Sequence, residues 1–138
     1  MKKLIDIAKR FLLILPLGML PFTACQESLE ERCARECKEY TKKKCPVLIA
    51  KDIYLDSLTF DQSHHLMTYY YTVEGVLDDA EALQQHDIRG MLLKELKNSA
   101  GDKLYKEAGY SFRYVYFSGK QKGMQLVEAT FRKSDYQK

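Results

Sequence analysis

Four cysteines are the residues of this chain whose chemistry is the most specific, and all fall in its first third. Cys25 ends an uncharged run, whereas Cys33, Cys37 and Cys45 have the spacing C-x3-C-x7-C. Structural zinc sites use closely paired ligands such as C-x2-C, and thioredoxin-like redox sites use C-x-x-C. Neither pattern is present. We therefore predict no metal site and expect a structural role for these thiols, with metal binding and redox catalysis as less favoured alternatives.

Outside the cytoplasm thiols tend to be oxidised, and the three cysteines beyond Cys25 allow one intramolecular disulfide at most. Cys37–Cys45 is the preferred pair, because it would join a helix to the strand that follows. Cys33–Cys37 stays open as an alternative, although two cysteines one helical turn apart are near the geometric limit for a disulfide. The third thiol would stay free or pair with another chain.

No catalytic constellation accompanies the cysteines. His64 and His65 lie in a polar segment and are expected to be solvated turn residues, and His86 has no His or Glu four residues later. The sequence has no G-x-S-x-G motif, no phosphate-binding loop and no H-E-x-x-H. The pair Asp78-Asp79 is expected to cap a helix rather than to act as acid and base. We predict that the protein is not an enzyme and uses no cofactor.

Residues 1–24 have the features of an export signal. A basic start of Lys2, Lys3, Lys9 and Arg10 precedes the uncharged run from Phe11 to Phe22. This run is too short to cross a bilayer as a helix, which takes about 20 residues. Its length is instead typical of the apolar region of a secretory signal.

The segment ends with Phe22-Thr23-Ala24-Cys25, which resembles the lipobox of bacterial lipoproteins: Leu, Ala or Ser, Gly or Ala, then Cys. Ala24 and Cys25 fit this pattern, Thr23 is a small variant, and Phe22 departs from the preferred Leu. The resemblance implies cleavage before Cys25, a diacylglyceryl group on its sulfur and acylation of the new amine, typically with palmitate. Gln26 follows, not the Asp associated with inner-membrane retention. We therefore expect an outer-membrane lipoprotein, on either the periplasmic or the surface face.

Removal of this signal changes the charge balance of the chain. The whole sequence has 22 Lys and Arg against 19 Asp and Glu, and the four basic residues and one acid before Cys25 leave 18 of each. A neutral domain outside the cytoplasm lacks the electrostatic footprint of a nucleic-acid-binding protein. Nucleic acid is therefore excluded as a partner.

Residues 25–45 form a densely charged segment, in which one apolar stripe recurs at helical spacing. We interpret it as a charged helical stalk or tether that Pro46 ends. Residues 46–138 are assigned to a single domain. Its alternating and β-branched runs predict strands, and these runs are 47–60, 66–73, 110–117 and 124–131.

Apolar residues at helical spacing between the second and third of these strands predict a helix from Asp78 or Asp79 to about Leu96. A second, short helix is predicted from Asp102 to Ala108. The element order α-β-β-α-β-β indicates a two-layer α+β domain, in which an antiparallel sheet of about four strands has a helix packed on one face.

All ten tyrosines follow Cys25. A sheet covered by helices on one face leaves its other face for water or a partner, and tyrosine is enriched at interfaces. Tyr69 and Tyr71 of one strand, and Tyr114 and Tyr116 of another, are therefore candidate binding residues. The alternative is that they pack in the core or at its rim.

Together these features predict a membrane-tethered lipoprotein domain with a non-catalytic binding or structural role in the cell envelope. The expected partners are the membrane, through the lipid, and an envelope protein. One alternative is an inhibitor or immunity-type lipoprotein that blocks a toxin or hydrolase with a loop such as 61–65 or 118–123. Another is an enzyme with an unrecognised site. Outside its signal, the sequence resembles no named family.

We predict that a Cys25→Ala variant incorporates no labelled palmitate, because the thiol that accepts the diacylglyceryl group is gone. Metabolic labelling of cells followed by immunoprecipitation measures this directly, with the wild-type protein as the positive control. Equal labelling of the two proteins would contradict the anchor.

Overall fold

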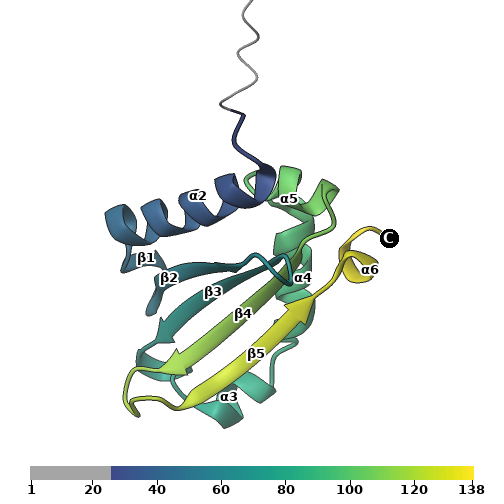
Figure 1. Ribbon diagram of the computed structural model, residues 1–138. Helices are drawn as coiled ribbons and strands as arrows, with labels where there is room; N and C mark the ends of the chain where they lie inside the picture. The colour runs from purple at the N-terminus through teal and green to yellow at the C-terminus, as the bar shows by residue number, and fades with distance from the viewer. Residues whose placement is uncertain (1–25) are drawn as a thin grey trace, which may run out of the picture.

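The computed structural model describes residues 26–138, so the predicted signal and Cys25 lie outside the described residues. Its centre is a five-stranded sheet whose strands stand in chain order (Figure 1). The strands are β1 (Val47–Ala50), β2 (Ile53–Asp61), β3 (Leu66–Val73), β4 (Ser111–Ser118) and β5 (Gln125–Phe131). Neighbouring strands are antiparallel except β3 and β4, which are parallel.

Helix α2 (Leu29–Lys44) precedes the sheet and lies against β2. Cys33 and Cys37 on its inner stripe are buried in the core. The Thr41 hydroxyl donates a hydrogen bond to the Leu58 carbonyl and accepts one from the Leu58 N–H. The helix that we predicted as a charged stalk is therefore packed on the sheet along one stripe, and most of its charged side chains face solvent.

Four short helical segments carry the chain from β3 to β4, and one more follows β5. They are η2 (Gly75–Leu77), α3 (Ala80–Gln84), α4 (Ile88–Asn98), α5 (Lys103–Glu107) and α6 (Lys133–Tyr136). In Figure 1, α4 lies behind the sheet, α5 lies at its upper end next to the start of α2, and α3 lies at its lower end. None of the helices in residues 26–138 has the length and apolar character needed to cross a bilayer.

The helix predicted from Asp78 to Leu96 is split into α3 and α4. Asp79 caps α3 by accepting hydrogen bonds from the first-turn N–H groups, and Asp87 starts α4 by accepting one from the Gly90 N–H. Asp102 stands at the start of α5 as predicted, but its carboxylate accepts hydrogen bonds from the Tyr69 and Ser99 hydroxyls instead of capping the helix.

The α+β class is confirmed, whereas the predicted sheet of about four antiparallel strands is wrong in two respects. The segment 47–60 makes two strands instead of one, with a reversal at Asp52, whose φ of 62° lies in the left-handed region. The connection between β3 and β4 returns the chain to the end of the sheet where β3 began. It is long enough for a crossover, so that these strands pair in parallel.

The core lies on one face of the sheet. Phe112 of β4, Phe131 of β5 and Leu96 of α4 are almost completely buried there, together with the cysteines of α2. The opposite face, toward the viewer in Figure 1, carries half-buried aromatic rings, of which Tyr70 and Phe117 stack with centroids 6.4 Å apart. The molecule therefore has two layers, one of helices and one of strands.

The structure has Cys33, Cys37 and Cys45 as free thiols, so the predicted Cys37–Cys45 bond is not formed in it. Cys33 and Cys37 are hydrogen-bonded neighbours, and this bond together with burial raises the pKa of the Cys33 thiol. Cys45 is half-buried at the end of α2, where burial also raises the pKa of its thiol.

We predict that Leu96→Ala lowers the free energy of unfolding by about 2–5 kcal/mol, the usual cost of a cavity in a packed core. Leu96 is 1% exposed and Leu104, the matched control on α5, is 48% exposed. Leu104→Ala should cost less than about 0.5 kcal/mol. Urea unfolding of both variants measures the difference, and equal losses would contradict the packing.

In the folded mature protein, a maleimide should label Cys45 well before Cys33 and Cys37, because the latter pair is buried. All three should react in urea. Mass spectrometry of labelled peptides identifies the sites, and protein purified without reductant gives a second arm. Loss of both Cys45 and Cys37 labelling in urea, in the protein purified without reductant alone, would establish the disulfide predicted from the sequence.

Candidate functional site

An open groove of about 460 Å³ separates α4 from the β1–β2 hairpin. Ile88, Met91 and Glu95 line it from the α4 side, and Ile49 and Ile53 face them from the hairpin. The hairpin and α4 also contribute Ala50 and Leu92. The rest of the lining comes from β3, β4, β5 and the segments between β3 and α4, namely Val73, Leu77, Leu83, His86, Tyr116 and Val127.

Apolar side chains dominate this groove, since only His86, Glu95 and Tyr116 among its thirteen lining residues are polar. Ile49 and Met91 at its rim are exposed. An apolar hollow with an exposed apolar rim is typical of a binding surface. The sequence did not reveal it, because its residues come from eight helices and strands and one connection.

The four tyrosines that we predicted as binding residues form two stacked pairs on the helix-covered face. Tyr69 stacks on Tyr114 with centroids 5.1 Å apart, and Tyr71 stacks on Tyr116 at 4.5 Å. Tyr71 and Tyr114 are only 7% exposed, and of the four only Tyr116 lines the groove. The predicted exposed tyrosine surface is therefore not what the structure has, because α4 and α5 cover that face.

Burial is the main reason why the pKa of each of these four phenols lies above its usual range. The Glu95 carboxylate adds to the rise of the pKa for Tyr71, Tyr114 and Tyr116. Tyr69 differs, since its hydroxyl donates a hydrogen bond of 2.8 Å to Asp102. At neutral pH all four are protonated and can act as hydrogen-bond donors or acceptors.

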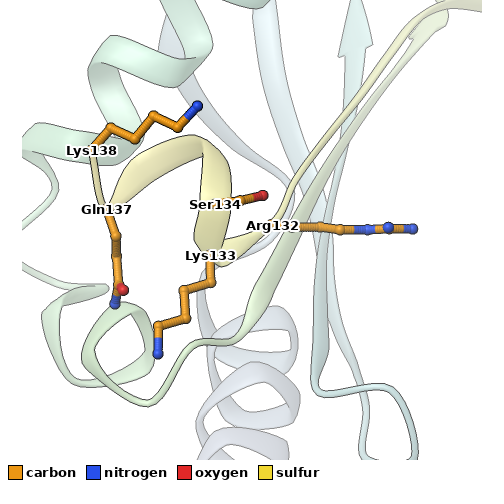
Figure 2. Close-up of a pocket in the computed structure, with 5 residues that line it drawn as sticks. All are labelled: Arg132, Lys133, Ser134, Gln137 and Lys138. Atoms are coloured by element: carbon orange, nitrogen blue, oxygen red, sulfur yellow. The ribbon is translucent and has the colours of Figure 1, made fainter.

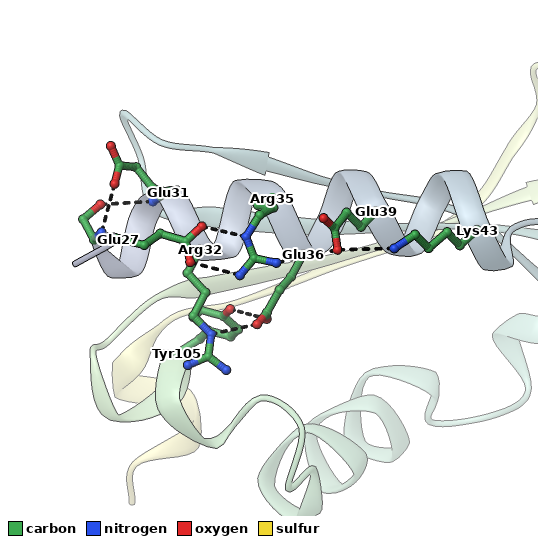
Figure 3. Close-up of polar contacts among 9 residues, drawn as sticks. Glu27, Glu31, Arg32, Arg35, Glu36, Glu39, Lys43 and Tyr105 are labelled. Atoms are coloured by element: carbon green, nitrogen blue, oxygen red, sulfur yellow. Dashed lines mark hydrogen bonds and ion pairs between the residues drawn. The ribbon is translucent and has the colours of Figure 1, made fainter. Parts of the chain in front are cut away.

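The outer surface of α2 carries ion pairs (Figure 3). Arg35 makes two hydrogen bonds to Glu27, and Arg32 makes one of 2.7 Å to Glu36. The Tyr105 hydroxyl donates to the other oxygen of Glu36 at 2.6 Å, which joins α5 to α2. Such exposed pairs contribute little stability individually. This network holds two helices in register and has no open coordination position or nucleophile.

The histidines of the β2–β3 turn have structural contacts: His64 contacts its own turn, and His65 contacts Glu30 of α2 and Tyr110. His64 lies 2.7 Å from Asp61, and hydrogen bonds from Ser63 and His64 lower the pKa of Asp61 to about 2. His65 stacks on Tyr110 with centroids 5.0 Å apart. Within residues 26–138 no three His, Cys, Asp or Glu side chains converge in a way that could hold a metal ion.

A second hollow, of about 570 Å³, lies beside α6. Figure 2 shows that its side chains diverge: Arg132 points away from the helix, and Lys133 and Lys138 point to opposite sides. Cations that diverge cannot surround one ligand. The groove beside α4 is therefore the better candidate site.

Two solved structures have a similar fold. One is described as "a putative secreted protein" from Pseudomonas aeruginosa, with a TM-score of 0.61, 16% identity, and coverage of 80% of this chain and 98% of that chain. The other is the pilotin EpsS from the Vibrio vulnificus type 2 secretion system, with a TM-score of 0.57, 9% identity, and coverage of 80% and 93%. At such identities the likeness is one of fold alone.

No curated protein sequence matches this chain. A family model described as "Domain of unknown function (DUF8479)" matches residues 28–127. This range starts at the cap of α2 and ends within β5, so that it includes α2, the whole crossover and every residue that lines the groove. The chain therefore belongs to the DUF8479 family.

Proposed function

We propose that this protein is a non-catalytic binding module of the cell envelope, and that it holds an apolar segment of an envelope protein in the groove between α4 and the β1–β2 hairpin. A lipid on Cys25 would tether the module to the outer membrane. The observation that carries the proposal is the groove itself, with its apolar lining and its exposed rim residues Ile49 and Met91.

The groove is a gap in the helix layer. Helix α2 contacts β2, and α4 contacts the far strand β5, so the two helices lie over different parts of one sheet face. Val73 of the central strand β3 lines the hollow between them. A bound segment would fill this gap and so complete the helix layer over the sheet.

Burial of apolar side chains in the groove would drive binding. Removing a side chain such as Ile or Met completely from water contributes about 1.5–3 kcal/mol. Ile49 and Met91 are half-exposed or more, and the segment would bury apolar side chains of its own. Association costs several kcal/mol, so a few such anchors must act together. The lining residues include no Ser, Thr, Cys or Lys that could serve as a nucleophile.

The likeness to a pilotin of a secretion system supports an envelope partner, because it is the same fold in a component of such a system. The position of the tether is compatible with this role. The chain enters α2 next to α5, and α3, which contributes Leu83 to the groove, lies at the opposite end (Figure 1). A membrane anchor before Gln26 would leave the groove accessible.

We expect Ile49→Asp to weaken binding of the partner at least tenfold, because it places a charge in the apolar groove. A photo-crosslinking residue at Met91, introduced in cells that make the lipidated protein, should join the partner segment, and mass spectrometry should identify it. The yield of this adduct measures binding.

Leu48→Asp is the matched control, since Leu48 is the neighbour of Ile49 on β1, is 57% exposed against 50%, and does not line the groove. It should leave the adduct unchanged. Equal adduct yields from the Ile49→Asp and Leu48→Asp proteins would refute a role of the groove.

A further inference from the structure

Glu95 is the single acidic side chain among the residues that line the groove. It belongs to α4 and is exposed when the groove is empty. None of the ion pairs in residues 26–138 includes it. An otherwise apolar groove therefore has one negative charge that the described part of the chain does not compensate.

Hydroxyl groups accompany this charge. Tyr116 lines the groove and stacks on Tyr71, and Tyr114 is their neighbour on the same sheet face. In contrast to Tyr69, whose hydroxyl is bound to Asp102, these three tyrosines make no side-chain hydrogen bond to another group of residues 26–138. Burial, and to a smaller extent the Glu95 carboxylate, raise the pKa of all three phenols, so that they stay protonated beside the groove.

An apolar segment that fills the groove removes water from this carboxylate. A carboxylate that loses its water without gaining a partner strongly opposes binding, whereas a cation on the ligand turns the same group into a contribution to specificity. The lining residues offer no compensating Lys or Arg. His86 is the one lining residue that could carry a positive charge, and no ion pair joins it to Glu95, so we look to the occupant for the cation.

We propose that the segment held in the groove carries one Lys or Arg, whose cation pairs with Glu95 and donates hydrogen bonds to the tyrosine hydroxyls beside it. This inference rests on the proposed function and adds the chemistry of the partner: apolar side chains and one basic side chain. A divalent metal ion fits less well, because Mg²⁺ and Ca²⁺ take several oxygen ligands and Glu95 is the only carboxylate there.

Two labelled synthetic peptides of amphipathic helical sequence test this pairing. They are identical except at one position beside the apolar face, which is lysine in one and the neutral norleucine in the other. Fluorescence anisotropy with the mature lipidated protein in nanodiscs gives both affinities, and empty nanodiscs supply the background. Wild-type protein should bind the lysine peptide about tenfold more tightly, as a close desolvated charge pair would.

Glu95→Gln should abolish this preference, and Tyr116→Phe should reduce it severalfold. Glu128→Gln is the matched control, because it makes the same change on the uncovered face of the sheet, and it should leave the preference intact. Circular dichroism verifies that each variant is folded.

The possible failures are distinguishable. Equal binding of both peptides by the wild type, weakened by Ile49→Asp, would overturn the basic side chain and leave the groove as an apolar binding site. A tenfold preference that survives Glu95→Gln would show that a group other than Glu95 recognises the lysine, and would overturn the pairing of this lysine with Glu95. Absence of binding by either peptide at concentrations up to the millimolar range would overturn both proposals.

Discussion

The structure depends on covering one apolar face of a five-stranded sheet. Phe112 and Phe131 on neighbouring strands need a helical layer above them, and Leu96 of α4 and Cys33 of α2 supply it. The helix that precedes the sheet therefore cannot be a free tether, because its inner stripe is part of the core. The two-layer arrangement leaves the other sheet face to half-buried aromatic and polar side chains, which protect each other from water.

The same constraint produces the groove. A parallel pairing of β3 and β4 requires a crossover, and that crossover has to run over the face that needs covering. It is built from short capped helices that do not span the sheet, since Asp79 and Asp87 each start a new one. The helical layer therefore stays open between α4 and the β1–β2 hairpin. The groove is the part of the sheet face that the helical layer leaves uncovered. Its lining is therefore apolar like the rest of that face, and Glu95 is the one acidic residue in it.

Several elements could be predicted because their causes are local. Alternation of Tyr69 and Tyr71 with their neighbours indicates a strand at 66–73, which is β3 to the residue. The same parity correctly puts Tyr114 and Tyr116 on one face of β4. Parity does not say which face the helices cover, and in the structure this face is the covered one, where Tyr71 and Tyr114 are buried and Tyr69 and Tyr116 are half-buried. The turn at Asp52 could not be recognised in the sequence. The segment 47–60 reads as one long strand, because the positive φ of Asp52 leaves no mark on the pattern of apolar residues around it.

The sequence by itself determined the main strand-forming runs and a helix start at Asp78 or Asp79, since each follows from neighbouring residues. The export signal, and the neutral charge that its removal would leave, stay predictions from the sequence. Only the tertiary structure decided the direction of β4 beside β3, the packing of α2 and the groove. These depend on which distant apolar surfaces meet: Ile49 and Met91 lie 42 positions apart and face one another only after the crossover has folded. The secondary-structure propensity of a segment does not predict which distant apolar surface it packs against, because the hydrophobic effect is non-directional.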